Sequence, residues 1–144
     1  YCLARDMDPR GGGGRDALGG AWSQAETVVI GIDGLSNGEL RWMRDGEVVP
    51  LPIVPWLDAV ARETAASDPR FATVAPFVIP SGATDAQPFQ VRGYPGLTLG
   101  TVDPDIGAPR HYHRPSDTPE NLDPAQLMDS IAYAEAFLRR VMAG

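Results

Sequence analysis

The sequence has no lysine, one cysteine and no long apolar run. All twelve basic residues are arginine, against nineteen acidic residues, so the net charge is -7 and the isoelectric point lies near 4.6. Binding to a phosphate backbone needs clustered cationic side chains, so nucleic acid is not expected as a partner. Cys2 has no second cysteine with which to form a disulfide in the chain. No segment approaches the roughly 20 apolar residues of a membrane helix, so no membrane span is predicted.

The 144 residues suit one globular domain, with a core large enough to fold without a metal or a disulfide. The chain begins Tyr1-Cys2-Leu3, with neither an initiator methionine nor a signal-like segment. We therefore expect a processed or excised piece of a longer protein. Any targeting signal would then lie outside this chain.

Residues 1–24 contain four consecutive glycines, Gly11 to Gly14, and a further pair soon after them. Such a run has high backbone entropy and buries nothing, so we predict a flexible segment here. A phosphate-binding loop is the functional alternative, but the glycine spacing and the Lys-Ser/Thr step that it needs are missing. The domain proper is expected over residues 25–144.

Strand patterns recur along the rest of the chain. Residues 27–33 form a short, continuous, β-branched run that is typical of a strand buried on both faces. Two more strands are predicted over 72–79 and 96–102. Residues 39–51 have the pattern of a hairpin with its turn at Asp45-Gly46.

Helical spacing separates these strands. A helix is predicted from Pro55 to about Ser67, and a short one over 85–92. The side chains expected on the buried face of the first helix are Ile53, Trp56, Leu57, Val60 and Thr64.

The last helix has the clearest signals. Asp123 is expected as its N-cap, Pro124 as its first residue and Gln126 as the partner in a capping box. The apolar residues at helical spacing are Leu127, Ile131, Ala134, Phe137, Leu138 and Val141. Strands that alternate with helices predict an α/β fold, a three-layer α/β/α arrangement around a mostly parallel or mixed sheet.

Three side chains stand out as candidates for chemistry. Asp33 ends the most convincing buried strand, and ligands of such sheets gather at the carboxyl ends of strands. An aspartate before a glycine is also a common turn, and this reading stays open. The only two histidines, His111 and His113, alternate along the chain and so can face the same way if it is extended. Histidine is a frequent metal ligand, although both can also be incidental polar residues of a loop.

The residues after His111 resemble a known family. Residues 112–122, Tyr-His-Arg-Pro-Ser-Asp-Thr-Pro-Glu-Asn-Leu, resemble the Tyr-His-x-Pro-x-Asp-Thr-x-(Asp/Glu)-Asn motif of the zinc aminopeptidases of metallopeptidase family 28. Residues 28–34, 81–89 and 92–97 are similar to other segments of that family, in the same order. The final helix also agrees, so the resemblance covers roughly residues 17–142.

The resemblance implies a zinc exopeptidase-like fold and roles for individual residues. Asp33 would be a terminal ligand of one zinc ion and His113 of the other. Tyr112 matches a tyrosine whose phenol hydrogen-bonds the developing oxyanion in some members, although a tyrosine with a packing role is an equal alternative. Zinc in this family would lower the pKa of a bridging water and polarise the scissile carbonyl.

The same resemblance implies supporting roles for two further residues and no role for two others. Asp117 would orient the backbone or His113, and Asp85 would shape the wall of the cleft. Ala86 stands where many members have histidine, and His111 has no counterpart.

The sequence also departs from the family. The His-x-Asp motif that supplies the bridging aspartate is absent, and so is the Glu-Glu pair that supplies the general base and a further ligand. Residues 13–16, where that pair is expected, read Gly-Gly-Arg-Asp. Two ligands are fewer than the three protein ligands usual for catalytic zinc. We therefore expect weak or absent zinc binding and no peptide hydrolysis by this chain alone.

Three functions remain open at this point. The chain is the C-terminal part of a zinc-dependent exopeptidase that acts on a peptide or an amino-acid derivative, with a missing N-terminal segment as its partner. Alternatively it is an inactive exopeptidase-like domain that serves as a binding or scaffold module, or a glutaminyl cyclase-like acyltransferase with one zinc. The family resemblance also suggests a secreted or periplasmic protein.

Overall fold

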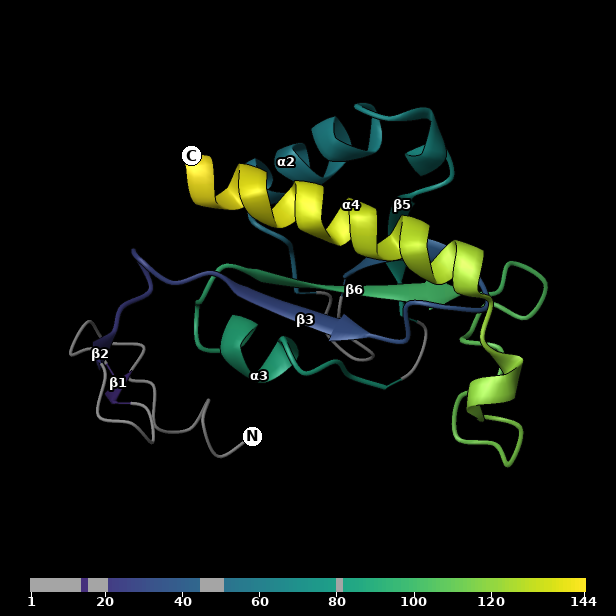
Figure 1. The fold of residues 1–144 in the computed structure, drawn as a ribbon. Helices are drawn as coiled ribbons and strands as arrows, with labels where there is room; N and C mark the ends of the chain where they lie inside the picture. The colour runs from purple at the N-terminus through teal and green to yellow at the C-terminus, as the bar shows by residue number, and fades with distance from the viewer. Residues whose placement is uncertain (1–13, 16–20, 45–50, 80–81) are drawn as a thin grey trace. The chain divides into compact units, whose positions relative to one another are not determined.

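The computed structural model describes residues 14–15, 21–44, 51–79 and 82–144. The strands are β1 (Gly14–Arg15), β2 (Ala21–Trp22), β3 (Val29–Asp33), β4 (Glu39–Arg44), β5 (Ala75–Val78) and β6 (Gly96–Val102). The helices are α2 (Pro55–Ala65), α3 (Gln87–Gln90) and α4 (Pro124–Ala143), with 3₁₀ turns η1 (Pro69–Phe71) and η2 (Pro119–Asn121). Figure 1 shows their arrangement.

The main sheet has four strands in the order β3-β6-β4-β5. It mixes parallel and antiparallel neighbours, so the predicted α/β fold with a mixed sheet is confirmed. The inner strand β6 is buried along its whole length, as expected for a strand with a neighbour on each side. A separate antiparallel pair joins β1 to β2, with Gly14 opposite Trp22.

The chain divides into two compact units, which are described separately. Unit 1 comprises Tyr1–Gly31, Arg44–Val54 and Val78–Thr98. Hydrogen bonds between distant segments of the sequence hold its described part: Val29 N donates to Pro95 O at 2.9 Å, and Gln24 Nε2 donates to Arg92 O at 2.7 Å. The short helix α3 belongs to this unit.

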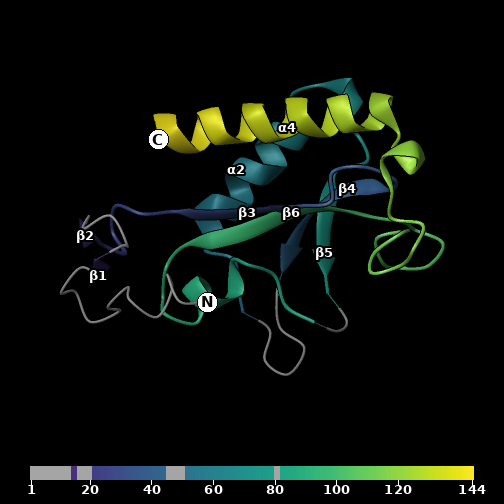
Figure 2. The ribbon, with the colours of Figure 1, turned by 60° about the horizontal axis from the view of Figure 1, so that its bottom comes forward.

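Unit 2 comprises Ile32–Met43, Pro55–Phe77 and Leu99–Gly144. Its helices α2 and α4 lie side by side over one face of its strands (Figures 1 and 2). Their contact is built around Tyr133 of α4, whose hydroxyl donates to Ala61 O of α2 at 2.9 Å and whose ring meets Phe71 edge-on at 5.3 Å. Trp42 of β4 is buried and donates its indole N–H to Asp58 of α2 at 2.9 Å.

The strand predicted over 96–102 is confirmed as β6, whereas several other predicted elements are shorter than expected. The strand expected over 72–79 begins only at Ala75, because the 3₁₀ turn η1 and the turn after it occupy the preceding residues. The helix expected over 85–92 is a single turn, α3. The strand β4 is the first arm of the predicted hairpin, whereas its turn at Asp45-Gly46 and most of the second arm lie outside the described residues.

Two side-chain predictions for the helices are wrong. Trp56 is 46% exposed, and the buried residues of α2 are Leu57, Ala61 and Thr64. Ile131 is 42% exposed, while Tyr133 is fully buried. The other predicted residues of the two faces are buried or half-buried, and Ala61 and Tyr133 join them, linked by the hydrogen bond from the Tyr133 hydroxyl to Ala61 O.

The capping box is also wrong, although the N-cap is confirmed. Asp123 Oδ1 accepts from the backbone N–H groups of Ala125 and Gln126, at 3.0 and 3.1 Å. Gln126 does not return this bond, because its Oε1 accepts from Gly38 N at 3.1 Å. Within the described residues, no helix is both long and apolar enough to cross a membrane.

Candidate functional site

Asp33 is the last residue of β3 and is exposed. The chain turns at Gly34, which has a φ of 57°, a conformation that glycine adopts at little cost. Thr101 of β6 fixes this turn, since its N–H donates to Gly34 O at 2.8 Å and its buried hydroxyl lies 2.6 Å from both Gly34 O and Ser36 O. The strand end that carries the carboxylate is therefore rigidly connected to β6.

Gly100 of β6 lies directly against this strand end. A Cβ atom at Gly100 would stand 2.6 Å from Asp33 O and 2.5 Å from Met43 Cε. Such contacts are closer than real Cβ atoms tolerate, so only glycine fits without a shift of the neighbouring strand. The position of Asp33 depends on this close approach.

The loop after Asp33 is also bound to the start of α4. Ser36 Oγ accepts from Asp123 N at 2.8 Å, and Gly38 N donates to Gln126 Oε1. The N-cap residue of α4 thus has two functions: it caps the helix and holds the loop that follows the candidate ligand.

The second candidate segment follows β6. Asp103 comes directly after that strand, is 2% exposed and forms an antiparallel bridge with Ala108. Its carboxylate accepts from Arg110 Nε at 2.5 Å and from Asp105 N at 2.9 Å. The Arg110 guanidinium, and next the backbone N–H of Asp105, hold the pKa of the Asp103 carboxyl below its ordinary value.

His113 has an unusual backbone. Its φ is 57°, in the left-handed region that non-glycine residues seldom occupy, and its side chain is exposed. The ring of Tyr112, which is 51% exposed, stacks on the imidazole with the centroids 3.8 Å apart and the planes inclined by 18°. Tyr112 is therefore not a core tyrosine.

His111 and Asp117 belong to the same loop as His113. His111 Nδ1 lies 3.0 Å from Ser116 Oγ, within hydrogen-bond distance. Asp117 is exposed, and its backbone N–H donates to Arg114 O at 3.0 Å. The roles proposed for its carboxylate stay predictions.

Asp85 is exposed and lies in unit 1, whereas the other predicted site residues lie in unit 2. The structure brings Tyr112 and His113 together. The shared metal site of Asp33 and His113 stays a prediction.

Asp33 and His113 offer donor atoms of the kind that binds zinc, but two ligands are too few for a complete site. Histidine nitrogen and carboxylate oxygen both bind zinc. Among the described residues, however, no group of three or more His, Cys, Asp or Glu side chains is placed to hold a metal ion. These residues therefore do not complete a zinc site, and we derive no catalytic step through a metal.

Sequence reasoning missed Asp103, Arg110 and Thr101. The signal that could have found the first pair is an aspartate directly after a buried strand with an arginine seven residues later, ahead of the histidines. Thr101 offers no such signal, because its role depends on where the turn at Gly34 lies in space.

Three solved structures share this fold. A zinc aminopeptidase from Bacillus subtilis has a TM-score of 0.64 and 18% identity, over 83% of this chain and 28% of its own. Glutaminyl cyclases from Porphyromonas gingivalis and Tannerella forsythia have TM-scores of 0.61 and 0.59, with 16% and 18% identity. They are matched over 83% and 82% of this chain, and over 42% and 40% of their own. This chain thus spans less than half the length of each.

The family itself is identified from the sequence. No curated protein matches the chain in a sequence search. The family model of Peptidase family M28 matches residues 22–138, which is most of the chain and includes both Asp33 and the 111–117 segment. The chain belongs to Peptidase family M28.

Proposed function

We propose that this chain is the C-terminal part of a zinc-dependent exopeptidase of the aminopeptidase type. In this proposal Asp33 and His113 each contribute one zinc ligand, and Tyr112 donates its phenol to the substrate oxyanion. The general base and the bridging carboxylate come from a further segment of the domain. The substrate is a peptide or an amino-acid derivative, and this chain alone is inactive.

The backbone of His113 is the observation that carries the proposal. Residues held in sparsely populated backbone conformations cluster at functional sites, where the surrounding structure supports the strain. His113 has such a conformation within the segment that resembles the family's ligand motif, and its imidazole is exposed.

The anchoring of Asp33 adds support. Its carboxylate is exposed, while the turn beside it is fixed by Thr101 and the loop after it by Asp123. A fixed backbone with a free carboxylate suits a ligand that has to be held in place before the metal arrives.

Zinc titration of the chain tests the ligand assignment. Isothermal titration with Zn²⁺ should give weak binding that is lost in Asp33→Ala and in His113→Ala. Glu135→Gln, which removes an exposed carboxylate of α4 that pairs with Arg139, is the matched control and should bind as the wild type does. Binding that survives both ligand substitutions would contradict the assignment.

Activity tests the statement that the site is incomplete. With a chromogenic amino-acid amide as substrate and excess zinc, the chain should show no turnover above the buffer rate. Turnover that disappears in His113→Ala would show that this chain holds a general base after all.

The glutaminyl cyclase reading is kept as a second candidate, because two of the three solved structures are glutaminyl cyclases. The two enzymatic readings differ in their products. A longer protein that contains this chain should release a free amino acid from a peptide with N-terminal glutamine if it is an aminopeptidase, and ammonia if it is a cyclase. Neither product, with intact folding, would favour the binding module.

A further inference from the structure

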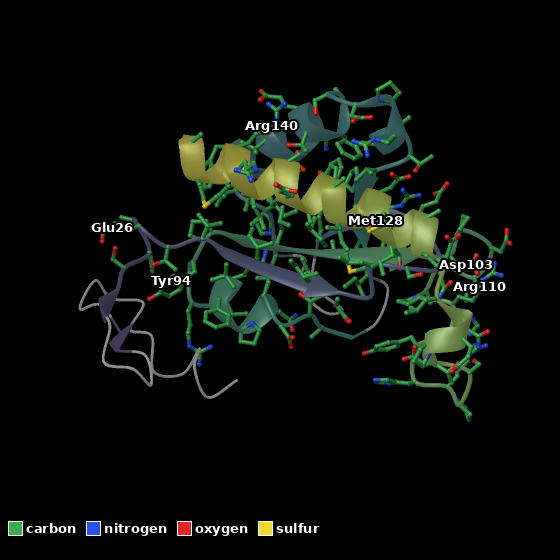
Figure 3. The ribbon with its side chains drawn as sticks, viewed as in Figure 1. Glu26, Tyr94, Asp103, Arg110, Met128 and Arg140 are labelled. Carbon is green, nitrogen blue, oxygen red and sulfur yellow. The ribbon has the colours of Figure 1, made fainter. Side chains whose placement is uncertain are left out.

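The loop between β6 and the candidate ligand His113 begins with an ion pair whose carboxylate is buried. Figure 3 shows Asp103 and Arg110 side by side where the chain leaves β6. The Asp103 side chain is 3% exposed, whereas that of Arg110 is 55% exposed. A buried carboxylate is costly unless it is paired, and removal of its partner is more costly still. The loop therefore has a strong reason to keep Arg110 at Asp103.

The loop backbone closes around the same residue. Asp103 N donates to Ala108 O at 3.0 Å, and Gly107 N donates to Asp103 O at 2.8 Å. Together with the side-chain bonds to Asp105 N and Arg110 Nε, these contacts make residues 103–110 a closed turn. The turn ends three residues before His113.

Two further hydrogen bonds hold the residues around and after His113. Arg114 N donates to His111 O at 3.0 Å, and Asn121 Nδ2 donates to Ser116 O at 2.9 Å. His113, with its left-handed backbone, is the third residue of the turn that Arg114 N closes on His111 O, and this turn directly follows the closed turn 103–110. A strained residue keeps its conformation only when the structure on both sides supports it.

We propose that Asp103 is a positioning residue for His113. Its buried carboxylate holds Arg110, and through Arg110 it holds the 111–113 segment in the conformation in which the Tyr112 and His113 rings stack. The effect of Asp103 on metal binding rests on the function proposed above, whereas its effect on the conformation of the 111–113 segment does not.

Asp103→Asn tests the proposal on the intact chain. Asparagine keeps the size and the acceptor oxygen but loses the charge that holds the guanidinium. The ring-current shifts that Tyr112 and His113 impose on each other, measured by NMR, should collapse towards random-coil values. The zinc affinity should fall about tenfold, as is usual when a group that supports a metal ligand is removed.

Two further variants separate positioning from general stability. Arg110→Gln should give the same loss of ring-current shifts, and the double variant should lose no more than either single one, since both act through one contact. Glu135→Gln removes an exposed carboxylate of α4 whose partner is Arg139, and it should leave the shifts unchanged. Circular dichroism should show that every variant remains folded.

The outcomes are distinct. A lower unfolding temperature for Asp103→Asn with unchanged Tyr112 and His113 shifts would overturn the positioning role and leave Asp103 as a stabilising residue only. Collapsed shifts with a zinc affinity equal to that of the wild type would support the positioning role and contradict the assignment of His113 as a zinc ligand.

Discussion

The phenol of Tyr133 is enclosed between α4 and α2, and its hydroxyl donates to the carbonyl of Ala61. A hydrogen bond of this kind contributes about 1 kcal/mol to folding, and an acceptor left buried without it costs a similar amount. Tyr133→Phe should therefore lower the free energy of unfolding by about 1 to 1.5 kcal/mol. Urea denaturation measures this change. Tyr112→Phe, at an exposed ring, is the control and should change stability by less than about 0.5 kcal/mol.

The same tyrosine should make stability depend on pH in the alkaline range. Burial raises the pKa of Tyr133 above its ordinary value, while the unfolded chain releases the proton near pH 10. The contribution of the neutral phenol is thus complete below about pH 10 and is lost as the pH rises further. The unfolding free energy of the wild type should fall more steeply above pH 10 than that of Tyr133→Phe. Equal slopes would contradict this.

At the scale of elements, α4 shows what helical spacing can predict. Its start was predicted to the residue, because an aspartate before a proline has a local physical role as N-cap that needs no tertiary information. Its buried face was predicted in part: Ala134 and Phe137 are buried as expected, whereas Ile131 is exposed, as is Met128 at 63%. Spacing alone does not say which of two apolar stripes meets a neighbour.

The cap of α4 should contribute measurably to stability. Asp123→Ala removes the acceptor of two backbone N–H groups and should cost about 1 kcal/mol. Asp123→Ser should recover most of this, since serine is also a good N-cap. Thermal unfolding followed by circular dichroism measures both. A loss in Asp123→Ser equal to that in Asp123→Ala would show that the cap is not the cause.

The contact between α2 and α4 should not tolerate a larger residue at Ala61. This side chain is fully buried, and its carbonyl is bonded to Tyr133. Ala61→Leu should destabilise the protein by about 1 to 3 kcal/mol through overpacking. Trp56→Ala, on the exposed face of the same helix, should cost clearly less. Chemical denaturation of the two variants compares them directly.

At the scale of the whole molecule, the fold class and the family were predictable, while the site was only partly so. The fold class follows from the alternation of strand and helix patterns. The family follows from the 112–122 motif, which is a continuous stretch of the sequence. The contacts that position Asp33 join residues far apart in the sequence, such as Thr101 with Gly34, and no local pattern encodes them. Supporting residues are therefore harder to predict than the candidate ligands.

Zinc should stabilise the whole fold if the ligand assignment is right. A ligand that binds only the native state adds about 1.4 kcal/mol at ten times its Kd. The unfolding temperature should rise with added Zn²⁺, return to its original value with a chelator, and stay constant in Asp33→Ala and His113→Ala. An equal rise in those variants would indicate binding elsewhere.

A substitution at Gly100 would test the position of Asp33 without changing the side chain of any candidate ligand. Because a methyl group there would meet Asp33 O and Met43 Cε, Gly100→Ala should displace the end of β3 by a few tenths of an ångström while every carboxylate and imidazole keeps its chemistry. Any function that depends on the location of Asp33 is thereby separated from one that depends only on its charge. A single methyl group on a neighbouring strand thus measures how precisely the candidate site has to be spaced.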